Sequence, residues 1–331
     1  MPLLSVEESK LVRSCLGSRE PYDRIWAGGG HVAAASDELM LVVEGAANWE
    51  GGLLGTPFTD FLRLAGDEAR IDPQENGVKL SRGKVTLTLP LAPLKDFAWP
   101  KTPMAFQSLR LETEAIEEMH KVVAANGETG LQVTRFEMLG FAISKGVGYS
   151  LSLEALIKSK RKFPEGISLL LPSPFLSVLL SALKLYKHQE VEISFNDRMV
   201  FSTFRRGDGA DKVTLGAAVP AIASWLEVDK ISAPLQDAAP VNVDLSYLEK
   251  DLSLLQSLSR TIALSKAGVR CGAAHAWYEA ESVVNLPSDC SLSTSRLASI
   301  LPLAPRLTRV GTQVVEMEGE SFIAYLATAG A

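Results

Sequence analysis

Few residues of this sequence have the types and spacing that chemistry at a site requires. Cys271, His275 and Cys290 are potential zinc ligands, but they lack paired Cys-x-x-Cys spacing and a fourth ligand. The Gly28-Gly29-Gly30-His31 run has the composition of an oxyanion-hole loop, yet it lies between two short predicted strands and indicates a hairpin turn. No Gly-x-Ser-x-Gly, phosphate-loop or His-Glu-x-x-His motif occurs. We therefore predict no enzyme, no metal site and no cofactor.

Two further patterns have structural explanations. Residues 145–148, Lys-Gly-Val-Gly, form a fragment of a glycine-rich loop without its third glycine, which favours a turn between strands. The acidic cluster of Glu114, Glu117 and Glu118 lies at the start of a predicted helix, where negative charge complements the helix dipole. Neither pattern changes the prediction that this protein is not an enzyme.

The composition narrows the class of protein. The chain has 331 residues, 33 Lys and Arg against 39 Asp and Glu, a net charge of −6 and 47% hydrophobic residues. It is too apolar for a disordered protein and too acidic for a domain that holds nucleic acid by bulk positive charge. Three cysteines exclude a disulfide framework and favour a cytoplasmic location. The uncharged stretch 167–183 contains Pro172 and Pro174, so we expect a buried strand and a helix there rather than a membrane span.

Three predicted helices recur about 120 residues apart. Each has Ser or Thr at the expected N-cap, and the first two have Pro at the first helical position. A β-hairpin is predicted after each helix, because β-branched residues alternate around a short turn. The three helical segments are 54–64, 172–183 and 293–301. The strands that follow them are 69–72, 78–80 and 84–89; 191–195, 199–201 and 212–215; and 313–317 and 322–326.

A second amphipathic helix precedes each of these units. The helices are expected at 5–16, 113–125 and 245–260, and Ser5 with Glu8 has capping-box spacing. The strands expected after them are 24–27, 32–35 and 39–44; 130–136, 140–144 and 149–153; and 268–274, 275–280 and 283–286. Proline-rich segments near residues 90–103 and 232–240 separate the repeats. We therefore predict an α+β fold of three tandem domains, 1–102, 103–236 and 237–331, each made of two halves with a helix and an antiparallel sheet.

This organisation resembles the bacterial DNA polymerase III β sliding clamp family. Residues 35–43, Ala-Ser-Asp-Glu-Leu-Met-Leu-Val-Val, are similar to the first-domain hairpin of that family, and residues 97–100, Phe-Ala-Trp-Pro, resemble the segment that closes its first domain. Residues 325–331 take the place of its C-terminal strand and tail, without the family's Met-Pro-Met ending. The second-domain motif is matched only by residues 142–149. The shorter chain fits a phage version or an otherwise divergent version of the family.

The resemblance implies a function without bond chemistry. A sliding clamp is a closed ring, here a head-to-tail homodimer of DNA-clamp domains, that encircles duplex DNA and tethers polymerase and clamp loader through their peptide motifs. Topological linkage needs no tight electrostatic grip, so an acidic chain is compatible with DNA as a partner. Two alternatives remain open: a monomeric scaffold or processivity factor without ring closure, and an uncharacterised soluble enzyme.

Two sets of site residues follow from the resemblance. Bases on the helices are expected to line the central hole and contact phosphates without reading sequence, although solvated faces of amphipathic helices would also carry them. These bases are Lys10, Arg13, Arg63, Lys121, Lys184, Lys187, Arg260, Arg296 and Arg306. Apolar residues are expected to form a groove for a partner peptide, although strand or linker core residues have the same character. These are Tyr149, Leu151, Leu153, Pro234, Leu235, Val241, Tyr325 and Leu326.

Overall fold

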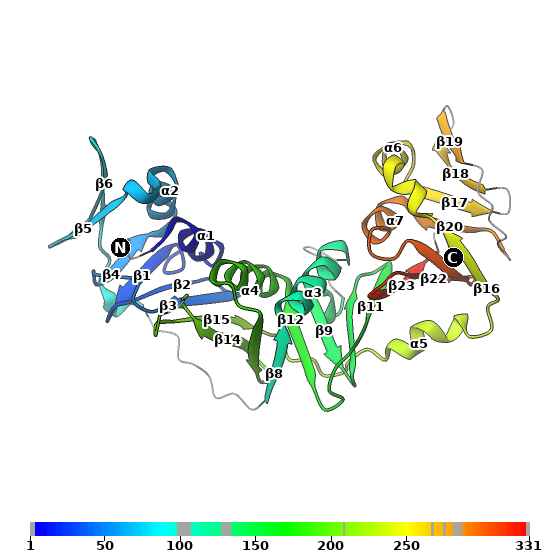
Figure 1. Cartoon of the computed structure of the whole chain (residues 1–331), viewed down its shortest axis with the longest axis horizontal. Coiled ribbons are helices and arrows are strands. Elements are labelled where there is room, and N and C mark those ends of the chain that lie inside the picture. The colour runs from blue at the N-terminus through cyan, green and yellow to red at the C-terminus, as the bar shows by residue number, and fades with distance from the viewer. Residues whose placement is uncertain are drawn as a thin grey trace. The chain divides into compact units, whose positions relative to one another are not determined.

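The computed structural model describes residues 4–97, 107–126, 134–207, 209–265, 268–273, 276–280, 286 and 288–328. The chain divides into two compact units (Figure 1). Unit 1 comprises Met1–Glu118 and Pro174–Ala221, and unit 2 comprises Met119–Ser173 and Ile222–Ala331. Among the described residues, no helix is both long and apolar enough to cross a membrane.

Unit 1 is built on an eight-stranded antiparallel sheet of order β4-β1-β2-β3-β15-β14-β13-β8. The strands are β1 (Arg24–Gly28), β2 (His31–Ala35), β3 (Leu39–Val43), β4 (Gly51–Leu54), β8 (Gln107–Glu112), β13 (Glu190–Phe195), β14 (Met199–Arg205) and β15 (Lys212–Ala218). A separate sheet contains β5 (Arg70–Gln74), β6 (Gly77–Arg82) and β7 (Val85–Pro90). At the centre of the larger sheet, β3 pairs with β15 through Leu41 and Leu215, which are both buried.

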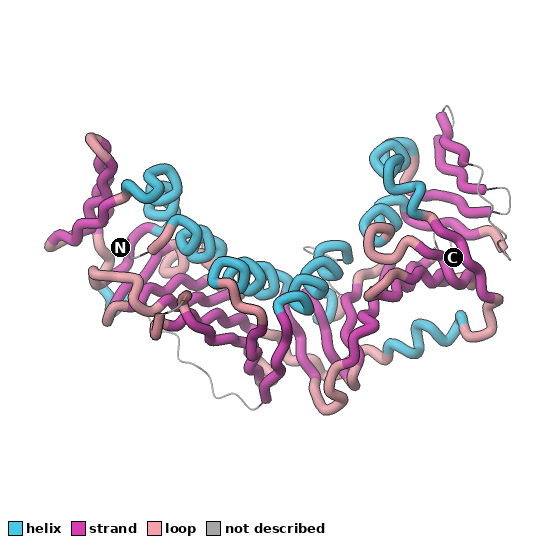
Figure 2. Tube along the Cα trace, in the orientation of Figure 1, coloured by secondary structure: helices cyan, strands magenta, loops and turns pink. Residues whose placement is uncertain are grey.

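Helices α1 (Val6–Ser14), α2 (Gly55–Ala65) and α4 (Ser173–Tyr186) lie along one face of this sheet (Figure 2). Short 3₁₀ turns occupy η1 (Gly66–Glu68) and η2 (Leu94–Asp96). The predicted capping box starts α1, because Ser5 Oγ accepts from the Glu8 N–H and Glu8 Oε2 accepts from the Ser5 N–H. Phe58 and Leu62 of α2 are buried. Removing one apolar side chain of this size from water contributes about 1.5–3 kcal/mol to stability.

Unit 2 repeats this architecture in a sheet of order β12-β9-β10-β11-β23-β22-β21-β16. The strands are β9 (Gly140–Ser144), β10 (Val147–Leu151), β11 (Ala155–Lys162), β12 (Ser168–Pro172), β16 (Pro240–Asp244), β21 (Arg306–Val310), β22 (Val314–Glu318) and β23 (Phe322–Ala327). A four-stranded sheet contains β17 (Thr261–Ser265), β18 (Gly268–Ala273), β19 (Ala276–Ala280) and β20 (Cys290–Ser293).

The helical segments of unit 2 are shorter. They are the end of α3 (Thr113–Asn126), α5 (Val228–Ser232), α6 (Leu252–Leu258) and α7 (Thr294–Ile300), with 3₁₀ turns at η3 (Phe136–Leu139), η4 (Ala233–Leu235) and η5 (Ser246–Asp251). Helices α6 and α7 contact each other. They lie together on one side of the strands β21–β23, and α5 lies on the other side (Figure 1).

Strand order confirms the internal repeat. Three half-sheets share one order, with the fourth strand beside the first: β4-β1-β2-β3, β12-β9-β10-β11 and β20-β17-β18-β19. The other half-sheets run β15-β14-β13-β8, β23-β22-β21-β16 and β7-β6-β5. Both eight-stranded sheets arise in the same way, because the third strand of one half pairs with the last strand of another, β3 with β15 and β11 with β23.

The expected N-cap residue of α2 is wrong, and the expected serine at the N-cap of α7 does not cap through its side chain. The residue before α2 is Leu54, and Ser293 before α7 makes no side-chain cap hydrogen bond. In both cases a strand runs directly into the helix. The Gly55 N–H then donates to the Asp23 carbonyl at 2.9 Å, and the Thr294 N–H donates to the Arg260 carbonyl at 2.9 Å. A backbone carbonyl from the residue just before β1 or β17 therefore replaces the side-chain cap.

Three other expectations are corrected. The helix predicted over 245–260 is divided into η5 and α6. Of the strand predicted at 130–136, residues 130–133 lie outside the described residues and Phe136 begins η3. Of 283–286 only Leu286 is described, and it is not in a strand. The segment at 98–100 and the tail at 329–331 also lie outside the described residues.

Candidate nucleic-acid interface

The bases predicted on α1 and α2 are exposed and form ion pairs. Lys10 Nζ lies 2.7 Å from Glu7 Oε1. The guanidinium of Arg13 pairs with Asp60 on α2, and Arg63 Nη2 lies 3.4 Å from the same carboxylate. Asp60 therefore joins two arginines from neighbouring helices. Because exposed pairs of this kind contribute only about 0–1 kcal/mol, the two guanidinium groups can exchange this carboxylate for another anion at low cost.

The bases on α3 and α4 are also exposed. Lys184 Nζ lies 3.2 Å from Glu117 Oε1 on α3, and Lys121 is exposed on α3. Lys187 ends α4 in the left-handed conformation, with φ of 58°. The following N–H, of His188, donates to the Leu183 carbonyl at 3.0 Å and closes a Schellman-type C-cap. A positive charge at this position is favourable, because it complements the helix dipole.

Arg296 and Arg260 belong to unit 2. The Arg296 side chain on α7 is only 18% exposed, and its Nε lies 3.3 Å from Glu154 Oε2 in the turn between β10 and β11. Arg260 is exposed in the link between α6 and β17. No hydrogen bond or ion pair to its guanidinium is found among the residues that the structure describes.

Arg306 differs from the other predicted bases because it lies on strand β21. It is in register with Asp244 on β16 and Glu318 on β22. Its neighbour Leu307 is fully buried, so Arg306 points to the opposite, charged face of the sheet. The structure therefore separates Arg306 from the helical bases. The sequence analysis grouped Arg306 with the helical bases because it follows the segment of α7 closely, but no helical periodicity connects it with that helix.

The predicted groove residues all belong to unit 2, and most of them are buried. Tyr149, Leu151, Leu235, Tyr325 and Leu326 are core residues. Of the other three, Leu153 is 50% exposed, Pro234 is exposed and Val241 is half-buried.

The sheet of unit 2 brings several of these residues together. Leu151 on β10 and Tyr325 on β23 are both in register with Leu156 on the intervening β11, so the three share one face. Burial and the Glu316 carboxylate raise the pKa of Tyr325 to about 12. The phenol is therefore neutral at pH 7. The buried residues of the predicted groove therefore lie beneath the surface, and they leave little area for direct contact with a peptide.

An exposed apolar cluster, not predicted from the sequence, lies beside Leu153. Phe136 is 48% exposed and Leu139 is 36% exposed on η3. Because β9 and β10 are antiparallel, with Tyr149 opposite Ala142, the residues before Gly140 and after Leu151 lie at the same end of the hairpin. The signal was present as two apolar residues three apart, but the predicted strand 130–136 included only Phe136 of the two.

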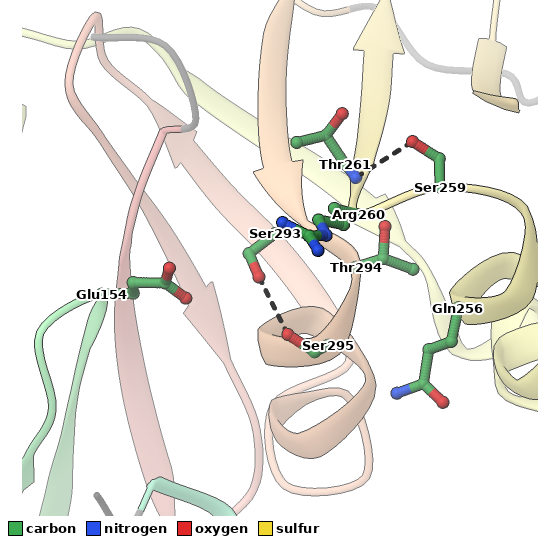
Figure 3. Close-up of a pocket in the computed structure, with 8 residues that line it drawn as sticks. All are labelled: Glu154, Gln256, Ser259, Arg260, Thr261, Ser293, Thr294 and Ser295. Atoms are coloured by element: carbon green, nitrogen blue, oxygen red, sulfur yellow. Dashed lines mark hydrogen bonds between the residues drawn. The ribbon is translucent and has the colours of Figure 1, made fainter. Parts of the chain in front are cut away.

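A pocket of about 450 Å³ lies in unit 2 (Figure 3). Most of its lining residues are Ser or Thr and come from the segment between α6 and β17 and from the junction of β20 with α7. The lining residues are Glu154, Gln256, Ser259, Arg260, Thr261, Ser293, Thr294 and Ser295. Thr261 on β17 pairs with Ser293 on β20, and this strand pairing brings the start of β17 next to the start of α7.

The other candidate residues have structural roles. Cys15, Cys271 and Cys290 are free and buried. Burial raises the pKa of Cys290 to about 11, and the nearby Asp289 carboxylate adds to this effect. His275 lies outside the described residues. Among those that are described, no group of three or more His, Cys, Asp or Glu could hold a metal ion. The glycines of 28–31 and of 145–148 form hairpin turns: Gly29, Gly30 and Gly146 have positive φ.

The fold matches solved structures along almost its whole length. No protein-family model matches this sequence, and no curated protein is similar to it. The DNA polymerase III β subunit of Thermotoga maritima superposes with a TM-score of 0.78 at 12% identity, covering 100% of this chain and 97% of that one. The Pseudomonas aeruginosa β subunit gives 0.77 at 13% identity, covering 98% and 97%.

A third match gives the same result. The Helicobacter pylori β clamp bound to a DNA ligase peptide superposes with a TM-score of 0.75 at 13% identity, covering 98% of this chain and 97% of that one. The fold of this chain is therefore the β sliding-clamp fold, as its sequence predicts. The low identities are those of a divergent chain.

Proposed function

We propose that this protein is a DNA sliding clamp, a ring that encircles duplex DNA and tethers polymerase and other replication proteins. The observation that carries the proposal is a pair of strand edges that the internal repeat leaves open. Within the part of the chain that the structure describes, β7 pairs only with β6, and β19 pairs only with β18. By repeat, β7 is the equivalent of β15 and β23, and β19 is the equivalent of β3 and β11.

A second copy of the chain satisfies both edges. Pairing β19 of one copy with β7 of another repeats the β3–β15 and β11–β23 junctions across an intermolecular interface. Such an interface is head-to-tail, and two copies close it into a ring when the rotation permits. Three domains, 1–102, 103–236 and 237–331, then give six around the ring.

The helical bases support DNA as the enclosed partner. Lys10, Arg13, Arg63 and Lys184 form exposed ion pairs that a phosphate can replace, and Lys121 and Lys187 are exposed on and after their helices. Arg296 is less exposed and pairs with Glu154. These contacts position DNA without reading its sequence. Arg306 lies on strand β21, apart from the helical bases, so the proposed DNA contact does not depend on it.

Partner recognition is proposed at Leu153, Pro234 and Val241, the members of the predicted groove with accessible surface. Apolar anchors of an extended peptide from a polymerase or clamp loader would pack there against the buried wall that contains Leu151 and Tyr325. The protein acts without bond chemistry, in the cytoplasm.

Retention on DNA tests the proposal. We expect the loaded protein to stay on nicked circular DNA and to leave after the circle is linearised, because a ring slides off free ends. An electrostatic binder would show equal retention on both. Sizing should give about twice the chain mass of 35.7 kDa. A monomer at every concentration would favour the alternative, a scaffold without ring closure.

A further inference from the structure

A buried carboxylate of unit 2 lies beside the exposed apolar cluster. Glu137 on η3 is 2% exposed, whereas Phe136 and Leu139 on the same turn are 48% and 36% exposed. Residues three apart lie on the same side of a 3₁₀ turn. Phe136 and Leu139 therefore share the exposed face of η3, and Glu137 lies on its buried face.

Two backbone groups from a distant part of the chain bind to this end of η3. Glu137 Oε1 accepts from Arg135 Nη2 at 2.7 Å and from the Leu226 N–H at 3.1 Å. Arg135 Nη2 also donates to the Ser224 carbonyl at 2.9 Å. Ser224 and Leu226 belong to the link between β15 and α5. The ion pair of Arg135 and Glu137 therefore holds this link against η3 at two points.

The link is the first part of residues 224–235, which we call the linker segment. Val228 at the start of α5 and Leu235 in η4 are buried. The Leu235 carbonyl accepts from Arg309 Nη1 on β21 at 3.1 Å. Between these points, α5 lies on the opposite side of strands β21–β23 from α6 and α7 (Figure 1). The linker segment is therefore held by η3 at one end and by β21 at the other.

Two tyrosines of the predicted groove lie next to the linker segment. Burial and the charge of Glu137 raise the pKa of Tyr149, whereas the Leu226 backbone N–H lowers it. Tyr325 has Ser232 of α5 as a hydrogen-bond partner of its phenol. The linker segment therefore borders the buried part of the predicted groove.

Two residues proposed for partner recognition lie on the two elements that Glu137 joins or beside them. Leu153, which is 50% exposed, lies at the same end of the β9–β10 hairpin as η3. Pro234 belongs to the linker segment and is exposed. Because Glu137 holds the linker segment against η3, it sets the position of one contact relative to the other.

The internal repeat shows that the fold does not require a carboxylate at this point. The segment after β7 in unit 1 corresponds to the linker segment after β15, because β7 and β15 are equivalent in the sheet order. There, Phe97 stacks on Trp26 of β1 with ring centroids 5.0 Å apart. Replacing a buried ion pair by apolar packing is often neutral or stabilising, so stability alone does not account for Glu137.

We propose that Glu137 is a positioning residue for partner binding, because its carboxylate holds the linker segment against η3 in the arrangement that an extended peptide with apolar anchors requires. The peptide contacts Leu153, Pro234 and the exposed face of η3, and it does not contact Glu137. This inference rests on the proposed clamp function and deepens its partner site.

The test compares Glu137→Ala and Glu137→Gln with Asp229→Asn, which removes an equal charge from an exposed position of α5. Binding of a labelled polymerase-derived peptide to the full chain is measured by fluorescence anisotropy. Hydrogen exchange of residues 222–228, followed by mass spectrometry, measures how firmly the linker segment is held.

We expect Glu137→Ala to speed this exchange and to weaken peptide binding, each by about tenfold, because the acceptor for Leu226 and the partner of Arg135 are both lost. Glu137→Gln keeps an acceptor for the Leu226 N–H and should show a smaller change in both measurements. Asp229→Asn should match the wild type. Binding of a short blunt-ended duplex should be the same in all three variants, because the helical bases are in place in each.

Faster exchange in Glu137→Ala with wild-type peptide affinity would show that the linker segment does not position the site, and would overturn the proposal. Unchanged exchange would overturn it as well, and so would an equal effect of Asp229→Asn or a parallel loss of duplex binding, which marks a general loss of structure. If Glu137→Ala does not fold, the same comparisons in Glu137→Gln decide. A wild-type chain that does not bind the peptide would overturn this inference, whereas retention on circular DNA tests the clamp function separately.

Discussion

Glu8 and Arg206 form a two-point ion pair in unit 1, with Arg206 Nε 2.6 Å from Glu8 Oε1 and Nη2 2.8 Å from Oε2. Tyr186 Oη donates to the same carboxylate at 2.9 Å, and Glu8 also caps α1. The pair therefore links the first helix of the chain to α4 and to the link between β14 and β15. Glu8 is 4% exposed, so solvent screens this interaction little.

Breaking this pair should destabilise unit 1. We expect Arg206→Ala to lower the free energy of unfolding by about 3 kcal/mol, because it leaves a buried carboxylate without its charged partner. Urea denaturation followed by circular dichroism measures the change. Arg198→Ala, at an exposed turn, should stay within about 0.5 kcal/mol. Equal effects of the two variants would show that the Glu8 pair contributes nothing specific.

The same carboxylate should make stability depend on pH. Burial alone would raise the pKa of Glu8, but the hydrogen bond and charge of Arg206 outweigh it and hold that pKa below the ordinary value of 4.5. Its contribution is therefore complete above that value and is lost as the pH falls through the lower, folded-state pKa. Glu8→Gln cannot titrate, so the stability gap between wild type and variant should narrow below about pH 4.5. A gap that is constant from pH 7 to pH 3 would contradict this assignment.

Charge reversal on the helices should shorten retention on DNA. Arg63→Glu with Lys184→Glu places two repelling charges on exposed positions of α2 and α4. We expect a several-fold shorter lifetime on circular DNA and a weaker dependence of short-duplex binding on salt. Arg198→Glu is the control for total charge. Wild-type retention by the double variant would mean that these residues do not face DNA.

Leu153 should matter for a partner peptide. Leu153→Asp places a charge on an apolar surface that is 50% exposed, so folding should be preserved. We expect peptide affinity to fall about tenfold, or about 1.4 kcal/mol. Leu64→Asp, at a residue of unit 1 that is 69% exposed, is the matched control. Fluorescence anisotropy with a labelled polymerase- or loader-derived peptide measures the difference; equal binding by wild type and Leu153→Asp would remove Leu153 from the groove.

The β7 edge should determine dimer formation. Val85 on β7 is 63% exposed, and a lysine there would oppose strand addition. We expect Val85→Lys to raise the concentration at which dimers form by at least about tenfold, as measured by analytical ultracentrifugation. Gln74→Lys, on β5 at the opposite edge of the same sheet, should not change it. If the two variants dimerise alike, β7 is not the interface.

Local patterns in the sequence predicted the fold correctly. Helical and alternating periodicities identified α1, α2, α4 and most hairpins, because side-chain direction follows directly from backbone repeat. The capping box of Ser5 and Glu8 was readable for the same reason, since its atoms are three residues apart. Repetition of these patterns predicted tandem α+β domains, and the resemblance to the β sliding clamp family implied the clamp fold, which structural similarity confirms.

The tertiary structure decided which residues meet. Asp60 pairs with Arg13, 47 positions away, and strand pairing brings Arg260 beside Ser293, so no local spacing could reveal either contact. Burial was equally inaccessible: Tyr149 and Leu326 have the same apolar character as Leu153, but only Leu153 is exposed. Composition and periodicity determined the elements of this protein, because they act through neighbours in the chain. Its pocket, its ion pairs and its accessible apolar surface depend on contacts between distant segments, and only folding creates those.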